Sequence, residues 1–153
     1  MKTNQLLLLL PLSLLLAFSG CTGPAETPLQ DGTYSVRFDE PDSTDWIAFM
    51  TLTIEDQKIL SVDYDYEGTG ANEGRLKSED TAYNEAMFST KGTKPTIYLQ
   101  KLEDELLRLQ DPDKVDTVSG ATTSSEDFRT FVAAALEAAR LGKTQPIIIP
   151  QVN

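Results

Sequence analysis

Hydroxyl side chains gather in one short segment, directly before a stretch whose apolar spacing predicts a helix: Thr117, Ser119, Thr122, Thr123, Ser124 and Ser125. The N–H groups at a helix N-terminus lack partners and the helix dipole is positive there, so such a segment can bind an anion such as phosphate. A simpler alternative is an ordinary cap, because Thr123 and Glu126 have the spacing of a capping box. The local pattern leaves both interpretations open.

Other kinds of chemistry are excluded by the composition. The sequence contains no histidine and a single cysteine, Cys21. Metal sites built on histidine or cysteine, Ser-His-Asp catalysis and Cys-His catalysis therefore have no residues to use. Carboxylates, hydroxyls, lysine, arginine and tyrosine remain, or a cofactor that supplies the chemistry itself.

Further candidates are weaker. Three tyrosines could stack on a planar cofactor, although a place in the core is the simpler expectation: Tyr66, Tyr83 and Tyr98. The glycine-containing loop 68–74 could border such a cofactor or only connect two elements. Lys77 could pair with phosphate, but we expect a solvated lysine. We expect Asp63 and Asp65 to form the polar face of a strand.

Three segments predict consecutive strands: 33–38, 46–54 and 59–66. The third segment alternates between apolar and polar residues. This alternation predicts that its apolar residues share one face: Leu60, Val62, Tyr64 and Tyr66. The turns between the three segments are short, apart from the acidic loop 40–45. This order predicts an antiparallel meander.

Helices are expected after the meander. A short one follows Ser78-Glu79-Asp80, and a longer one runs from Pro95 to Gln110, with Ile97 among its apolar residues. The clearest helix has apolar residues at i, i+3, i+4, i+7, i+8 and i+11: Phe128, Phe131, Val132, Ala135, Leu136 and Ala139. Residues 147–149 are a final strand or an extended tail. We therefore predict an α+β fold in which helices cover a small antiparallel sheet, with one domain over 31–142 and a C-terminal extended tail at 143–153.

The N-terminus has the order of a secretory signal peptide over 1–20: Lys2, an apolar run over 6–18, and the small residues Ser19 and Gly20. The run is shorter than the roughly 20 apolar residues that span a bilayer. Cys21 follows at once, and the segment resembles a lipobox, so we expect Cys21 to carry lipid, including fatty acid such as palmitate. Residues 21–30 would then form a tether on the extracytoplasmic face of a membrane. An ordinary cleaved signal with a chance cysteine is the alternative.

Charge limits the partners. Residues 1–20 contain one charged residue, Lys2, so the remaining chain has 12 basic and 24 acidic residues and a net charge of −12. This balance argues against nucleic acid and against anionic lipid as partners of the protein surface.

Seven consecutive residues resemble a known modification motif: Asp116-Thr117-Val118-Ser119-Gly120-Ala121-Thr122. The flavinylation motif of the FMN-binding domain family reads Asp, two variable residues, Ser or Thr, Gly, Ala, Thr. That family includes the flavin-carrying subunits of the sodium-pumping NADH:quinone oxidoreductase and of Rnf complexes, as well as extracytoplasmic lipoproteins. The resemblance extends more loosely from Asp31 to Phe131.

The resemblance implies a covalent cofactor. In this family a separate, magnesium-dependent flavin transferase splits FAD and joins FMN through its phosphate to the final threonine, which is Thr122 here. Thr123 is the rival site by proximity, and we prefer Thr122 because Thr123 fits the cap better. Four residues would form the recognition sequence and the walls of the phosphate site: Asp116, Ser119, Gly120 and Ala121.

A protein of this kind is an electron carrier, not an enzyme. The resemblance implies that it takes electrons from a membrane oxidoreductase and passes them to an extracytoplasmic acceptor. Two alternatives remain. One is a non-redox surface lipoprotein, with a ligand-binding or adhesion domain and an ordinary helix cap. The other is a domain that binds FMN without a covalent link or supports the assembly of a larger complex.

Overall fold

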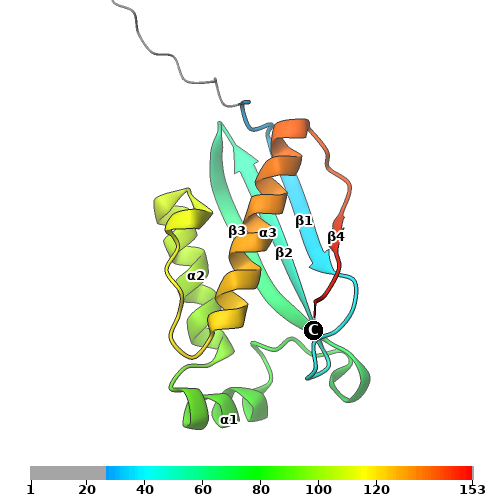
Figure 1. The fold of residues 1–153 in the computed structure, drawn as a ribbon, viewed down its shortest axis with the longest axis vertical. Coiled ribbons are helices and arrows are strands. Elements are labelled where there is room, and N and C mark those ends of the chain that lie inside the picture. The colour runs from blue at the N-terminus through cyan, green and yellow to red at the C-terminus, as the bar shows by residue number, and fades with distance from the viewer. Residues whose placement is uncertain (1–26, 153) are drawn as a thin grey trace, which may run out of the picture.

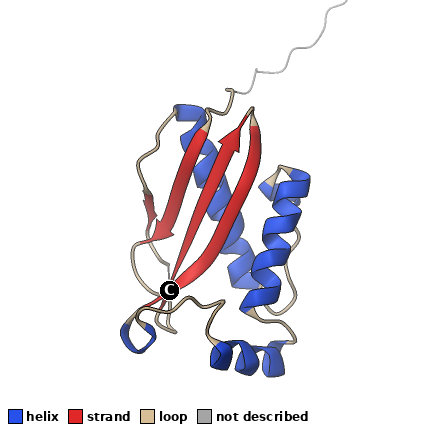
Figure 2. Ribbon diagram, turned by 180° about the vertical axis from the view of Figure 1, so that it is seen from behind, coloured by secondary structure: helices blue, strands red, loops and turns tan. Residues whose placement is uncertain are grey.

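The fold is one sheet with its long helices on a single face. The computed structural model describes residues 27–152, so the expected signal peptide and Cys21 lie outside the described residues. The elements are β1 (Gly32–Phe38), β2 (Trp46–Glu55), β3 (Lys58–Gly68), η1 (Gly70–Asn72), α1 (Thr81–Lys91), α2 (Pro95–Leu109), η2 (Pro112–Lys114), α3 (Thr122–Leu141) and β4 (Ile147–Ile149). Helices α2 and α3 lie on the same face of the sheet (Figure 1), and the view from behind shows the other face free of helices (Figure 2).

The sheet has the strand order β3-β2-β1-β4. Strands β1, β2 and β3 form the predicted antiparallel meander, so this part of the fold and the α+β class are confirmed. Strand β4 runs parallel to β1, with Val36 opposite Ile147, which makes the sheet mixed. Of the two alternatives for residues 147–149, the structure therefore has the strand.

A β-bulge corrects one prediction about β3. The partners of Thr53 and Ile54 are Ser61 and Ile59, so Leu60 is the extra residue between them. Ile59 is buried, whereas Leu60 is 59 % exposed. The prediction that Leu60 shares a face with Val62 was wrong because a bulge shifts the alternation by one residue.

The core lies between the sheet and the two long helices. All six residues of the apolar stripe predicted for the last helix are buried, which confirms that α3 packs on the sheet. In α2 the pattern predicted Ile97 as part of the apolar face, but Ile97 is 44 % exposed and Tyr98 is buried instead. Tyr98 shares the buried stripe with Leu99, Leu102 and Leu106, and Ile97 lies outside it because neighbouring positions of a helix differ by about 100°.

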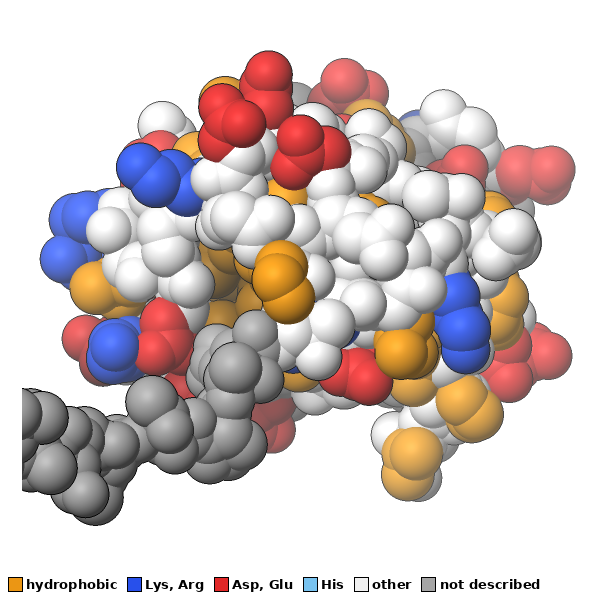
Figure 3. All heavy atoms as spheres, turned by 90° about the horizontal axis from the view of Figure 1, so that it is seen from above, with side chains coloured by type: hydrophobic (Ala, Val, Ile, Leu, Met, Phe, Trp, Pro, Cys, Tyr) orange, Lys and Arg blue, Asp and Glu red, His pale blue; other side chains and the backbone are white. Residues whose placement is uncertain are grey.

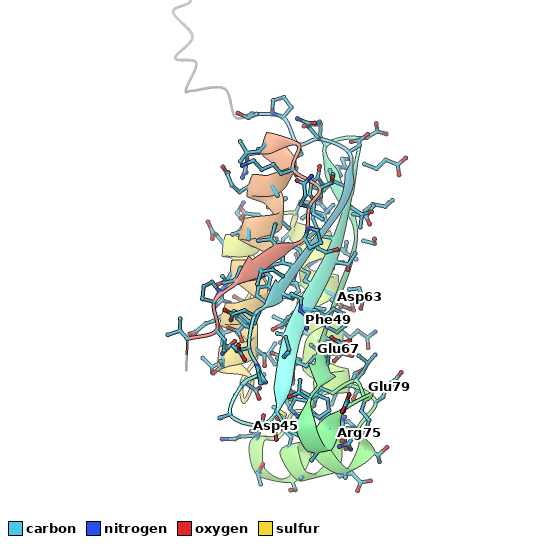
Figure 4. All side chains as sticks on the ribbon, turned by 90° about the vertical axis from the view of Figure 1, so that its right-hand side faces the viewer. Asp45, Phe49, Asp63, Glu67, Arg75 and Glu79 are labelled. Carbon is cyan, nitrogen blue, oxygen red and sulfur yellow. The ribbon has the colours of Figure 1, made fainter. Side chains whose placement is uncertain are left out.

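The face of the sheet away from the helices is polar and open. Phe49, Asp63 and Glu67 project from this face (Figure 4), and Glu67 pairs with Arg37 at 3.4 Å. Asp45 and Arg75 lie at one end of the sheet in the same view. The only large core formed by the described residues is therefore the one under α2 and α3.

The two ends of α3 belong to opposite ends of the molecule. The Gln30 N–H donates to the Ala139 carbonyl at 3.1 Å, so the start of the described chain lies beside the last turns of α3 (Figure 1). Acidic side chains gather along one edge of this end (Figure 3). Thr122 begins the same helix about 26 Å away, at about 1.5 Å per residue.

Candidate functional site

Buried Ser125 fixes the loop that carries the motif. The Val118 N–H donates to Ser125 Oγ at 3.0 Å, and that hydroxyl donates to the Ala121 carbonyl at 2.8 Å. Arg129 adds a bond from its guanidinium to the Val115 carbonyl at 3.2 Å. Residues 115–121 are therefore held by side chains of the helix that they precede.

Gly120 has no room for a side chain. Its φ is +81°, in the region that favours glycine, and a Cβ would lie 2.6 Å from the Lys91 carbonyl oxygen and 3.1 Å from Thr93 Cγ2. The motif loop therefore packs directly against the connection between α1 and α2. Glycine at this position is required by the backbone conformation and by this close approach.

The start of α3 differs from the predicted cap. The helix begins at Thr122 after Ala121, and no side chain caps it. The interpretation of Thr123 and Glu126 as a capping box was wrong, because Thr123 is the second residue of the helix and not the residue before it. The first N–H groups of a 20-residue helix are consequently left without side-chain partners.

The structure separates the predicted site residues into two groups. Asp116, Ser119 and Gly120 are exposed, whereas Ala121 is buried at the turn into α3. The other group is the helix start itself, where Thr122 and Thr123 are exposed. Of these six residues, only Thr123 lines the neighbouring cavity.

That cavity has a volume of about 320 Å³, which is within the roughly 300–1,000 Å³ typical of ligand sites. It lies between the sheet, α1, the start of α3 and the C-terminal residues. Its lining residues are Phe38, Asp42, Ser43, Thr44, Trp46, Ala48, Tyr66, Lys77, Tyr83, Thr123, Ser124, Asp127, Gln151 and Val152. Aromatic rings and a few charged groups thus meet beside Thr123, the residue that follows Thr122.

Lys77 lies in the wall of the cavity, and the expectation of a solvated lysine was wrong. Its side chain is 5 % exposed. The ammonium lies over three aromatic rings, 4.2 Å from the centre of Tyr66, 4.9 Å from Tyr83 and 5.8 Å from Trp46. Burial lowers the pKa of Lys77, although the charge of Asp42 opposes this effect. These contacts form an aromatic cage around a cation.

Asp42 is held in place to face Lys77. Its carboxylate accepts hydrogen bonds from the N–H and the hydroxyl of Thr44 and from the Trp46 N–H, and it pairs with Lys77 at 3.4 Å. Burial alone would raise the pKa of Asp42, but the Thr44 bonds and the charge of Lys77 hold it below its usual value. Asp42 is therefore an anion fixed on one side of the cavity.

Asp127 adds a second carboxyl to the cavity, one turn after Thr123. Burial, followed by the charges of Glu126 and Asp42, raises the pKa of Asp127 to about 6, and Lys77 opposes this rise. One cation and two carboxyl groups therefore line the cavity. Among residues 27–152 no group of three or more acidic, histidine or cysteine side chains could hold a metal ion.

The three candidate tyrosines and loop 68–74 differ in whether they line the cavity. Tyr66 and Tyr83 line the cavity, whereas Tyr98 is buried in the core. Burial raises the pKa of both cavity tyrosines, so they remain neutral hydrogen-bonding rings. Loop 68–74 does not line the cavity. Instead, Asn72 donates to the Thr44 carbonyl at 3.1 Å and so supports the loop that carries Asp42.

Asp65 corrects another prediction. It is buried and accepts bonds from the backbone N–H groups of Tyr66 and Ser78 and from the Ser78 hydroxyl, while Asp63 is exposed as expected. Asp65 thus ties the residue after Lys77 to β3. Asn84 on α1 holds the same segment, because its amide donates to the Lys77 carbonyl at 3.0 Å. Both residues position Lys77.

Sequence reasoning missed Asp42 and Asp127 and treated Lys77 as a solvated lysine. The pattern Asp-x-Thr at Asp42 is a recognisable local turn, because an Asp side chain often accepts from the residue two positions later. The chain's single tryptophan, Trp46, could have marked the same loop. Nothing local to Lys77 or Asp127 distinguishes either from a surface residue.

The fold and the site together define a small α+β domain that can carry an aromatic, anionic ligand beside the start of a helix. Residues 47–137 match the sequence model of the FMN-binding domain. This match covers more than half of the chain, so the chain belongs to the FMN-binding domain family.

The chain is also similar to two known proteins. The 15 kDa lipoprotein of Treponema pallidum (strain Nichols) is 37 % identical over 120 residues, which cover 78 % of this chain and 83 % of the relative. The crystal structure of the CPE2226 protein from Clostridium perfringens is 31 % identical and superposes with a TM-score of 0.75. That similarity covers 81 % of this chain and 99 % of the other.

The residues present fit FMN. A planar ring system with polar edges matches a cavity that combines the rings of Trp46, Tyr66 and Tyr83 with hydroxyl and charged groups. A phosphate matches the start of α3, where no side chain caps the first N–H groups. No helix within residues 27–152 has the length and apolar character needed to cross a membrane.

Proposed function

We propose that this protein is a membrane-anchored, extracytoplasmic electron carrier with FMN joined covalently to Thr122. The observation that carries the proposal is the position of Thr122. It is the exposed first residue of an uncapped helix, and the residue after it lines a cavity with aromatic and charged walls. Membership of the FMN-binding domain family and the match of residues 116–122 to the flavinylation motif support the same choice.

The attachment is a transfer reaction on the Thr122 hydroxyl. Thr122 Oγ forms a bond to the phosphorus of the FMN half of FAD, the pyrophosphate bond breaks, AMP leaves, and the hydroxyl proton is released. A flavin transferase performs the step. On the protein side, Gly120 and exposed Ser119 leave the backbone accessible, and the α3 N-terminus compensates the charge of the phosphoester.

When bound, FMN supplies the redox chemistry that the side chains of this chain lack. Trp46, Tyr66 and Tyr83 provide apolar walls that exclude water from one side of the cavity. Thr123, Ser124 and Asp127 offer hydrogen-bonding groups from α3. In this proposal a membrane oxidoreductase donates the electrons and an extracytoplasmic partner accepts them.

Co-expression tests the attachment. The full-length chain is produced in a bacterial host together with a flavin transferase, and the membrane fraction is examined by in-gel flavin fluorescence and intact mass. We expect a mass increase of one FMN less water. Thr122→Ala should lose the adduct, whereas Thr123→Ala, a matched threonine one residue away, should keep it. No adduct on the unaltered chain, or an undiminished adduct in Thr122→Ala, would refute the proposal and favour a non-redox lipoprotein.

The anchor has its own test. The name of the Treponema pallidum relative, 15 kDa lipoprotein, supports lipid on Cys21. We expect radiolabelled palmitate to enter the unaltered chain and not Cys21→Ser, and we expect the variant to leave the membrane fraction. Protease added to intact spheroplasts should digest the anchored domain if it lies on the extracytoplasmic face. Protection from the protease would contradict that location.

A further inference from the structure

Lys77 is the only buried lysine or arginine among residues 27–152. Burying an ammonium is costly unless charged or polar groups compensate it. An apolar side chain of similar length could fill the same space without that cost. The position of the charge therefore calls for an explanation beyond packing.

The protein compensates the positive charge of Lys77 only in part. Asp42 is 3.4 Å away, longer than the roughly 2.7–2.9 Å of a strong charged hydrogen bond. Asp65 on β3 and Asp127 on α3 contribute charge without contacting the ammonium. The other neighbours are the faces of Tyr66, Tyr83 and Trp46, which attract a cation but do not neutralise it.

The ammonium is also fixed in direction. The Lys77 N–H donates to the Tyr66 carbonyl at 2.9 Å, and the Lys77 carbonyl accepts from Asn84 on α1. Asp65 holds the next residue, Ser78, from β3. With its backbone attached to both β3 and α1, Lys77 points its charge at the cavity and not at solvent.

We propose that Lys77 sets the reduction potential of the flavin site, because its fixed ammonium compensates negative charge on a ring seated in the cavity. The inference rests on the proposed function of this cavity. The oxidised isoalloxazine ring is neutral. After it takes up two electrons and one proton from an external reductant, the ring carries one negative charge. A cation in the wall stabilises that state more than the neutral one and therefore raises the midpoint potential.

Spectroelectrochemical titration of the full-length, flavinylated protein in detergent tests this role, with dithionite as reductant. Lys77→Met should weaken the preference for reduced over oxidised flavin at least tenfold, which is a fall of about 30 mV in a two-electron potential. Lys77→Arg should restore most of the potential. Lys58→Met removes an exposed lysine at the β2–β3 turn and should leave the potential unchanged.

A second variant, which removes a negative charge, separates the effect of charge from the effect of packing. Asp127→Asn removes a negative charge from the same cavity, so at pH 8 we expect its potential to rise while that of Lys77→Met falls. A disturbance of packing alone would not produce opposite shifts. If Lys77→Met does not fold, as judged by circular dichroism, Lys77→Gln provides the neutral side chain.

A second measurement keeps this inference separate from the attachment to Thr122. Trp46 is the chain's only tryptophan and lines the cavity, so its fluorescence reports binding of free FMN to the protein without covalent flavin. Under anaerobic conditions we compare the affinities for oxidised and dithionite-reduced FMN. Lys77→Met should lower the affinity for reduced FMN at least tenfold more than that for oxidised FMN.

The outcomes are distinct. If Thr122 carries no flavin but the affinity ratio of free FMN depends on Lys77, the covalent proposal fails and the inference stands. If Lys77→Met weakens binding of both forms equally and leaves the potential unchanged, Lys77 does not distinguish the two redox states, and the inference is overturned. Absence of binding of either form to the unaltered protein would overturn it as well.

Discussion

Replacement of Ser125 by alanine tests how the motif loop is held. In the folded protein the Ser125 hydroxyl is fully buried and accepts the Val118 N–H, while it donates to the Ala121 carbonyl. The Ala121 carbonyl keeps a second donor, the Ser125 N–H, at 3.0 Å. Alanine at this position therefore orphans one group, the Val118 N–H, in a buried site.

The expected loss of unfolding free energy follows from the one N–H group that is left without a partner. A buried donor without a partner costs about 1–3 kcal/mol, and the better helix propensity of alanine recovers at most about 0.7 kcal/mol. We expect Ser125→Ala to lose about 1–2 kcal/mol of unfolding free energy. Each kcal/mol corresponds to a fall of about 2–8 °C in Tm for a domain of this size.

Urea unfolding followed by circular dichroism measures the change, and hydrogen exchange at the Val118 amide locates it. Thr130→Ala is the matched control, because it removes an exposed hydroxyl of α3 that bonds only to the Glu126 carbonyl. The control should stay within about 0.5 kcal/mol of the unaltered protein. Equal stabilities of the two variants, or unchanged exchange at Val118, would refute the role assigned to Ser125.

Three further predictions concern stability. Gly120→Ala forces a Cβ toward the Lys91 carbonyl at positive φ, so we expect a loss of at least about 1–2 kcal/mol in thermal unfolding; an unchanged Tm would contradict the close approach. Asn84→Ala removes the amide that joins the Lys77 segment to α1, and a loss of about 1–3 kcal/mol should appear in urea titrations, whereas a neutral result would show that the amide is dispensable. Burial raises the pKa of Glu103 to about 7, although its bond from the Tyr64 N–H opposes the rise. The folded state then binds more protons than the unfolded state between about pH 4.5 and 7, so stability falls as the pH rises through this range. Glu103→Gln keeps an acceptor and should abolish about 1–2 kcal/mol of that fall, after allowance for partial exposure; parallel pH profiles of both proteins would show that Glu103 does not titrate there.

Local patterns were enough for the elements that pack on the core. The stripe from Phe128 to Ala139 and the alternation over 33–38 each indicate one buried face, and the structure packs α3 and β1 against each other. Leu60 shows the limit of this reasoning, because a bulge changes the register and no residue type at that position announces it. The final strand was ambiguous since three isoleucines suit either a strand or a tail.

The sequence predicted the motif residues of the candidate site but not the residues that meet only when the chain folds. Thr122 and its neighbours form a contiguous motif, which a sequence can display. Lys77 acquires its role from Asp42, 35 positions earlier, and from rings on β2, β3 and α1. The error at Thr123 has a different, local cause: a capping pattern was present, but Ser125 holds the loop from within the helix.

If Cys21 carries lipid, the contact between Gln30 and Ala139 decides which end of the domain lies nearer the membrane. With lipid on Cys21, the end of the domain nearest the membrane would be the end where the described chain begins, and Thr122 would lie about 26 Å from Ala139 along α3. Residues 21–30 could add at most about 36 Å if fully extended. A cofactor at Thr122 would therefore face away from the bilayer, so a soluble acceptor could reach it without approaching the lipid surface. A donor embedded in the same bilayer would need a tall extramembrane domain, or the carrier would have to tilt on its tether.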